Sequence, residues 1–288
     1  MSAVYKRELR AYMNNVYGWL FMAIFLLFTS YVMFQNNLYD GMPEFELTLS
    51  GSQYALLLLI PILCMRSMAE DRHNKTDMFY LSLPMKTSSV VLGKYFAMLT
   101  VYAIPCVILC LYPLLLGTFG TVNYLTAYLA ILLYLILGAA LIAVCQFMSS
   151  LTDNLVIAAV LGVLAVAVLL FSPFLSHILP PTAIVSFIGC VVLALLLAGV
   201  AFLSTHNLNV TAITAAAAVV PLSVVYILSR KSFENLFPSL LQLLSPFAHF
   251  ATFCQFGTFS VPSLILLLSY PVLFVFLTVQ SADKKRWD

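Results

Sequence analysis

The side chains that could hold a metal ion or attack a substrate are few and scattered. They belong to four histidines, His73, His177, His206 and His249, and six cysteines, Cys64, Cys106, Cys110, Cys145, Cys190 and Cys254. Cys106 and Cys110 share a helical face, but no His or Asp accompanies them, which indicates packing rather than zinc binding. The cysteines lie mostly in apolar runs, so a disulfide framework is not expected either.

Motifs for phosphate binding and hydrolysis are also missing. Gly93-Lys94 matches the end of a phosphate loop, G-x-x-x-x-G-K-[ST], but Ser88 and Tyr95 stand where the motif needs Gly and Ser or Thr. The sequence contains no H-E-x-x-H and no G-x-S-x-G. We therefore predict no catalytic residue, no cofactor and no metal in this chain.

Charged residues, unlike the histidines and cysteines, are concentrated in one segment. Residues 65–94 hold eight of the 24 charged residues (13 basic, 11 acidic), namely Arg66, Glu70, Asp71, Arg72, Lys75, Asp77, Lys86 and Lys94. Apolar residues at helical spacing lie between them until Pro84, which predicts a half-apolar, half-charged helix. Such a helix could bind in a groove on a soluble partner protein. The alternative is that the segment is an ordinary solvated loop.

The rest of the composition predicts an all-α polytopic membrane protein. Hydrophobic residues make up 63% of the chain, charged residues 8%, and the mean hydropathy is +1.04, so lipid must be the solvent for most of it. Continuous apolar runs exclude barrel strands. We expect about eight spans, at 17–34, 51–65, 94–116, 123–148, 154–172, 184–203, 210–228 and 259–280. The net charge of +2 does not suggest a nucleic-acid partner.

Lys and Arg predict the orientation of these spans. With both termini in the cytoplasm, that side receives eleven basic residues: Lys6, Arg7, Arg10, Arg66, Arg72, Lys75, Lys86, Lys94, Lys284, Lys285 and Arg286. The outside receives only Arg230 and Lys231. The first apolar run has no small-residue cleavage site after it, so we interpret it as a retained span rather than a signal peptide.

Two flanking segments have amphipathic patterns. In residues 1–16, Tyr5, Leu9, Tyr12 and Val16 recur at helical spacing among charges, which predicts a helix on the cytoplasmic leaflet. In the expected outer segment, 229–258, phenylalanines recur at spacings of three and four. We interpret the outer segment as a cap at the membrane surface; the alternative is a gate or re-entrant element.

Ionisable groups within the spans are almost absent, although transporters driven by protons or sodium usually need them. Asp153 is the one charged residue between Lys94 and Arg230. We interpret Asp153 as a cap on the following span, with a proton relay as the alternative. The chain is then passive, structural, or driven by another chain that docks on residues 65–94.

Several motifs resemble those of ABC-2-type transporter permeases, in the branch named for gliding motility and nitrous-oxide-reductase maturation. They are Tyr5-Lys6-Arg7-Glu8-Leu9, Met65-Arg66 with Ala69-Glu70-Asp71-Arg72 and Lys75-Thr76-Asp77, Leu83-Pro84, Val91-Leu92-Gly93-Lys94, Ser149 to Asn154, and Lys284-Lys285-Arg286-Trp287. Two features depart from that family. Many members have Gly-Thr in place of Lys75-Thr76, and most have six spans, so 184–203 and 210–228 are the extra pair.

The resemblance implies the permease subunit of an ATP-binding cassette exporter in a bacterial plasma membrane. The subunit would pair with a second permease copy, identical or related, and with a cytoplasmic ABC ATPase. Residues 66–93 would form the coupling loop, with Arg66, Glu70, Asp71, Arg72, Lys75, Thr76 and Asp77 meeting the ATPase. Two alternatives stay open: a membrane scaffold or assembly factor, and a lipid-modifying enzyme built on His249 and Cys254.

Overall fold

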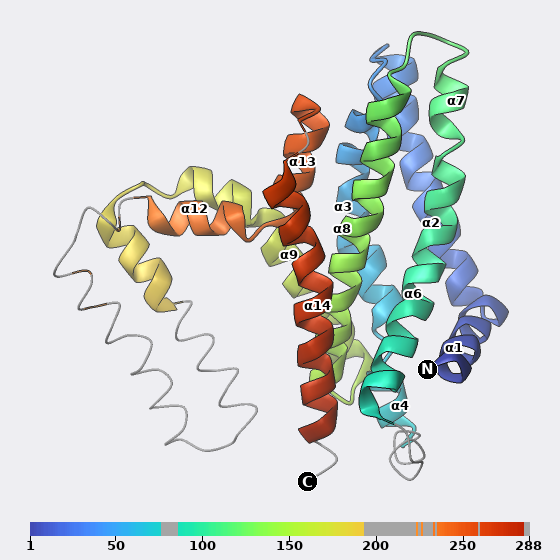
Figure 1. Ribbon diagram of the computed structural model, residues 1–288, viewed down its shortest axis with the longest axis vertical. Coiled ribbons are helices and arrows are strands. Elements are labelled where there is room, and N and C mark those ends of the chain that lie inside the picture. The colour runs from blue at the N-terminus through green and yellow to red at the C-terminus, as the bar shows by residue number, and fades with distance from the viewer. Residues whose placement is uncertain are drawn as a thin grey trace. The chain divides into compact units, whose positions relative to one another are not determined.

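The computed structural model describes residues 1–75, 86–192, 223, 226, 233, 235–258 and 260–284. The described residues form helices and no strand (Figure 1). The chain divides into two compact units, which are described separately: unit 1 is Met1–Leu170 with Pro246–Asp288, and unit 2 is Phe171–Ser245.

Unit 1 is a helical bundle whose elements follow the apolar runs of the sequence. They are α1 (Ser2–Asn14), α2 (Val16–Met33), the π-helix η1 (Phe34–Tyr39), α3 (Phe45–Cys64), α4 (Ala69–His73), α6 (Thr87–Leu109), α7 (Tyr112–Leu116), α8 (Tyr124–Leu151), α13 (Pro246–Phe256) and α14 (Val261–Lys284). The helix α9 (Leu155–Ile178) begins in unit 1. Long helices satisfy their backbone hydrogen bonds internally, which is what hydrocarbon requires.

Six helical segments among the described residues are long and apolar enough to cross a membrane. They are Val16–Tyr39, Phe45–His73, Thr87–Leu116, Tyr124–Leu151, Leu155–Ile178 and Val261–Lys284. They correspond to six of the eight expected spans. The expected span 184–203 begins in a short helix, Ala183–Val192, but its remainder and nearly all of 210–228 lie outside the described residues. The count of eight therefore stays a prediction.

The helix α8 is the centre of unit 1 and contacts α3, α6, α13 and α14. Its buried face carries Gly138, Ala140 and Ala143, small residues that let neighbouring helices approach closely. The ring of Tyr102 on α6 occupies the space where a side chain at Gly138 would lie, and its hydroxyl donates to the Tyr134 carbonyl at 3.0 Å.

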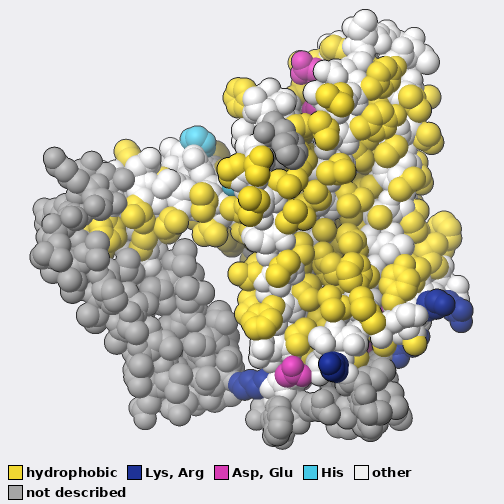
Figure 2. Space-filling model, viewed as in Figure 1, with side chains coloured by type: hydrophobic (Ala, Val, Ile, Leu, Met, Phe, Trp, Pro, Cys, Tyr) yellow, Lys and Arg dark blue, Asp and Glu magenta, His cyan; other side chains and the backbone are white. Residues whose placement is uncertain are grey.

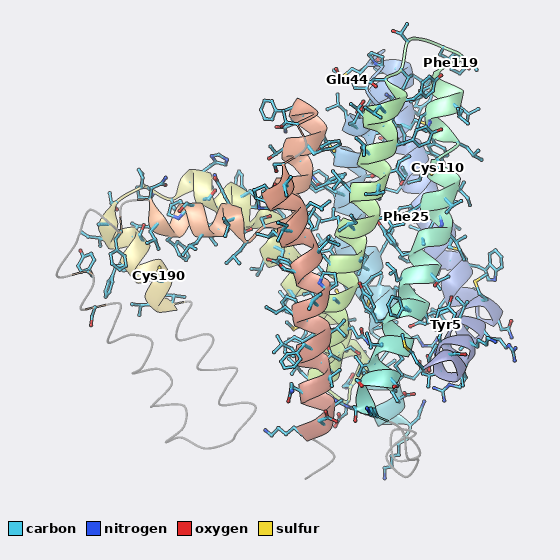
Figure 3. All side chains as sticks on the ribbon, viewed as in Figure 1. Tyr5, Phe25, Glu44, Cys110, Phe119 and Cys190 are labelled. Atoms are coloured by element: carbon cyan, nitrogen blue, oxygen red, sulfur yellow. The ribbon has the colours of Figure 1, made fainter. Side chains whose placement is uncertain are left out.

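Aromatic rings from four helices fill the middle of this bundle. Phe25 of α2 lies 5.7 Å from Tyr102 and 6.0 Å from Tyr134, between ring centroids, and Phe250 of α13 lies 5.5 Å from Tyr134 (Figure 3). All four side chains are fully buried. Their large contact area joins α2, α6, α8 and α13 into one core.

The start of α3 differs from the prediction. The helix begins at Phe45, not at residue 51, so Glu46 lies in its first turn and is buried rather than in an outer loop. An acid at a helix N-terminus is favourable. Ser52 of the same helix donates to the Tyr134 hydroxyl of α8 at 3.2 Å.

The expected coupling loop 66–93 is shorter than predicted. The helix α6 begins at Thr87, and the described part of the expected helix before it is only α4, Ala69–His73. Residues 76–85, with Pro84, lie outside the described residues. The fifth span also differs, since α9 continues to Ile178 with Pro173 inside it.

The helix α1 occupies the N-terminal segment that was predicted to be an amphipathic helix on the cytoplasmic leaflet, and its place on that leaflet stays a prediction. Leu9 and Tyr12 of the predicted face pack on the core, but Val16 does not. Val4 and Tyr12 are buried, whereas Val16 is 74% exposed and belongs to α2. The reason is Asn15, whose extended backbone ends α1 before the fourth predicted position. The helix α1 packs its apolar face on α6.

The segment 229–258 is described only in part, as α12 (Leu236–Leu243) of unit 2 and α13 of unit 1. In α13, Phe247, Phe250 and Phe253 are buried against α3 and α8, whereas Phe256 is 70% exposed. These phenylalanines therefore face protein rather than a membrane surface. The cap and the gate both stay predictions.

In unit 2, helix Ala183–Val192 packs on the start of α12. Gly189 lies directly against the Phe237 ring, and the Phe237 backbone N–H donates to the Ser186 hydroxyl at 3.4 Å. The ring centroids of Phe187 and Tyr226 are 4.6 Å apart.

Candidate functional site

A buried serine of α8 organises the start of the charged segment. The Ser149 hydroxyl accepts hydrogen bonds from the backbone N–H groups of Met68 at 3.2 Å and Ala69 at 3.1 Å, and it donates to the Met65 carbonyl at 3.3 Å. A helix N-terminus needs such an acceptor, which its own cap residue usually supplies. Here another helix supplies it, so α4 is attached to the end of α8.

Lys94 is the centre of the polar network at this end of unit 1. Its side chain is only 2% exposed, and its ammonium group lies 2.5 Å from the Asp71 carboxylate of α4 and 3.9 Å from the Glu8 carboxylate of α1. It also donates to the Ser67 carbonyl. A buried lysine needs such partners, because desolvation of an unpaired ammonium is costly. Lys94 therefore joins α1, the 65–68 turn and α4 to α6.

Arg72 attaches α4 to the end of α8, where α14 also makes a hydrogen bond. Its guanidinium, 9% exposed, donates to the Ser150 carbonyl at the end of α8 and lies 3.7 Å from the Asp153 carboxylate. The Ser281 hydroxyl of α14 donates to the same Ser150 carbonyl at 3.3 Å. A movement of α4 would therefore act on α8 and α14 as well as on α6.

The exposed side of this segment carries a different ion pair. Arg66 donates to both carboxylate oxygens of Glu70, at 2.9 and 2.8 Å, and its guanidinium lies 4.4 Å from the centroid of the Tyr17 ring. The side chains are 24% and 31% exposed. A bidentate pair with this exposure has a defined geometry and remains accessible to another protein.

The structure divides the seven residues predicted to meet a partner into three groups. Arg66, Glu70 and the exposed Lys75 reach the surface. Asp71 and Arg72 do not fit the expectation of a surface contact, because their side chains point into the bundle and pair with Lys94 and Asp153. Thr76 and Asp77 lie outside the described residues.

The cap contact that the structure shows at the start of α9 involves the neighbour of Asp153, and the capping role of Asp153 stays a prediction. The side-chain oxygen of Asn154 accepts from the Val156 backbone N–H at 2.9 Å. The Asp153 side chain is 67% exposed and faces Arg72. Asn154 stands directly before α9, at the position where a capping side chain is expected.

The helix α1 is also held by its own polar contacts. The Tyr12 hydroxyl donates to the Leu63 carbonyl of α3 at 3.2 Å. Burial, with a smaller contribution from Cys64, raises the pKa of Tyr12 well above its usual value of 10.0. The phenol therefore keeps its proton, and the hydrogen bond, throughout the physiological pH range.

Lys94, Glu8 and Ser149 are the members of the network that sequence reasoning missed. Lys94 was expected only as a topology-determining charge, yet a single lysine within the apolar run 90–99 is a signal in itself, because ionisable residues at membrane depth are rarely unpaired. Ser149 belongs to one of the motifs that resemble the permease family, but the sequence does not indicate its hydrogen bonds, because they depend on the packing of α8 against the 65–68 turn.

His249 and Cys254, the residues of the alternative enzyme site, both lie on α13. His249 Nδ1 hydrogen-bonds the Ser263 hydroxyl of α14 at 2.8 Å, while Cys254 is 5% exposed. Among the described residues, no three His, Cys, Asp or Glu side chains gather closely enough to hold a metal ion.

Basic side chains gather at one end of unit 1, the end that carries α1, α4 and the last turn of α14, and apolar side chains cover most of the flank above them (Figure 2). A protein-family model described as ABC-2 family transporter protein matches residues 5–234. No curated protein and no solved structure matches the chain.

Proposed function

Because the chain belongs to the ABC-2 family of transporter proteins, and so represents a membrane transport subunit, we propose that it is the permease of an exporter whose ATPase is a separate chain. Two copies of the permease form the translocation path. Two ATPase subunits dock on the outer side of α4. The family match and the six apolar helices support this proposal.

The observation that carries the proposal is the two-sided arrangement of α4. Its outer side presents the Arg66–Glu70 pair, and its inner side is attached through Asp71 to α6 and through Arg72 to α8. Lys94 also lies near Glu8 of α1, and the Ser150 carbonyl also accepts from Ser281 of α14. An ATPase that changes shape on hydrolysing ATP would bind the outer side. The inner contacts would then pass a difference in contact energy to the spans.

The test separates docking from folding by changing only the outer side. In Glu70→Lys, a reversed charge repels Arg66 and the partner surface, and like charges across an interface cost several kcal/mol. We expect ATPase co-purification in mild detergent, and permease-stimulated ATP hydrolysis, to fall about tenfold or more. The control is Asp40→Lys, the same charge reversal on the exposed Asp40, in the turn after η1.

The comparison is valid if Glu70→Lys and Asp40→Lys insert into the membrane, and unfold at the same temperature, as the parent does. Normal ATPase binding and stimulation by Glu70→Lys would refute the docking assignment. A parent chain that purifies alone, and that affects no ABC ATPase, would instead favour the scaffold interpretation.

A further inference from the structure

An open groove lies between α1 and α6. Met1, Ser2, Tyr5, Phe96 and Thr100 line it, and its volume is about 420 Å³, within the usual range for ligand sites. The Tyr5 and Thr100 hydroxyls hydrogen-bond across it at 3.0 Å. Phe96 is 40% exposed on α6, part of a candidate membrane span, so the groove has an apolar wall on a helix that contacts lipid.

Two cations follow the groove lining along α1. Lys6 is four residues after Ser2, and Arg10 is four residues after Lys6, so each of these pairs shares a side of the helix. Both are exposed. Glu8, the acidic residue of α1, pairs with Arg7 at 2.5 Å and lies 3.9 Å from Lys94. Figure 2 shows basic side chains gathered at the α1 end of unit 1.

We propose that this groove binds an anionic phospholipid. One acyl chain lies along Met1, Tyr5 and Phe96, and the phosphate lies by Lys6 and Arg10. Charge complementarity selects this occupant, since an apolar groove that ends at exposed cations matches an acyl chain that ends at a negative headgroup. The proposal is independent of the ATPase partnership, because none of these residues belongs to the Arg66–Glu70 surface.

The experiment measures lipid retained by the full chain. The protein is equilibrated with equal amounts of phosphatidylglycerol and phosphatidylcholine of the same chain length, purified in mild detergent, and analysed by native mass spectrometry. Each Lys or Arg near an anionic lipid contributes on the order of fivefold in affinity. We therefore expect Lys6→Gln/Arg10→Gln to weaken phosphatidylglycerol retention by roughly 10- to 30-fold.

Two further variants make the result specific. Lys86→Gln/Lys284→Gln removes two exposed lysines at the same end of unit 1 but away from α1, and should retain phosphatidylglycerol as the parent does. Ser2→Trp places an indole at the groove wall and leaves Lys6 and Arg10 unsubstituted. This variant should reduce retention of phosphatidylglycerol. All three substitute exposed residues, so unchanged thermal unfolding is the check on folding.

Three results would overturn the proposal. The first is equal retention of the two lipids by the parent. The second is an equal loss in the Lys86→Gln/Lys284→Gln control, which would indicate a general effect of charge. The third is a loss on removing Lys6 and Arg10 with none in Ser2→Trp, which would place the lipid on the helix surface rather than in the groove.

Discussion

Lys94 is unusual because three structural elements depend on one side chain. Its ammonium group has acceptors on α1, on the 65–68 turn and on α4, at a position where its own side chain is almost fully buried. A buried ion pair adds little stability compared with a well-packed apolar pair, but breaking one by removing a single partner is strongly destabilising. The network therefore serves to specify how these elements meet.

A double-mutant cycle on Lys94 and Asp71 tests this interpretation. Lys94→Met leaves Asp71 and Glu8 close together without their cation, so the free energy of unfolding should fall by about 3 kcal/mol. Asp71→Asn should cost less, since Glu8 still faces Lys94. Thermal and denaturant unfolding in detergent would measure both changes.

The double variant Asp71→Asn/Lys94→Met should lose less stability than the two single changes added together, by roughly 1–3 kcal/mol. Simple additivity would contradict a direct interaction between the two side chains. Ser89→Ala, a partly buried change on α6 away from the ion pairs, is a control for substitution in this helix.

Lys75 follows α4 with a left-handed backbone, at φ 55°. Only glycine adopts this conformation without steric cost. We expect Lys75→Gly to raise the free energy of unfolding by about 0.5–1 kcal/mol, measured as an increased Tm. Lys75→Ala removes the same charge but keeps the strain, so an equal gain in that variant would contradict the explanation.

At the scale of elements, the close approach of α6 and α8 depends on the absence of a side chain at Gly138. The Tyr102 ring of α6 fills that space, and the ring is fully buried, with its hydroxyl bonded to α8. Neither helix can move away without opening the aromatic core around Phe25. In lipid, van der Waals packing holds helices together, because the hydrophobic effect does not favour contact between helices over contact with lipid chains.

Gly138→Ala should therefore destabilise the bundle by about 1–3 kcal/mol, the usual cost of overpacking. Gly120→Ala is the matched control, since a methyl group there meets no neighbour. Tyr102→Leu in the Gly138→Ala background should recover part of the loss by removing the ring. An unchanged Tm for Gly138→Ala would show that α6 and α8 do not pack this closely.

At the scale of the whole molecule, the described basic residues share one end of unit 1, although they come from α1, α4, α6 and α14. The contacts between Lys94 and Asp71, and between Ser281 and Ser150, show that these segments meet there. By the positive-inside rule this end is expected to face the cytoplasm.

Cysteine labelling tests that orientation. Lys75→Cys lies at the basic end, and Gly120→Cys lies in the exposed turn between α7 and α8. A membrane-impermeant maleimide added to intact cells should label Gly120→Cys but not Lys75→Cys, which should react only after the membrane is opened. The parent, with six native cysteines, sets the background. The opposite pattern would invert the topology.

Sequence alone determined the features that depend on local composition. Apolar runs of sufficient length predicted six helices that the structure contains, because hydrocarbon leaves the backbone no alternative. The amphipathic α1 and the charged segment before α6 were equally visible. Family resemblance needed only short motifs in the right order, and the family match agrees with it.

The tertiary structure decided what each charge does. In sequence, Glu70 and Asp71 are equivalent neighbours, but the 100° turn between them directs one to Arg66 at the surface and the other to Lys94 in the interior. Ser149 acquires its role only because α8 brings its hydroxyl to two N–H groups about 80 residues away in sequence. Such contacts join residues far apart in the chain, so periodicity, which reports only on local neighbours, does not contain them.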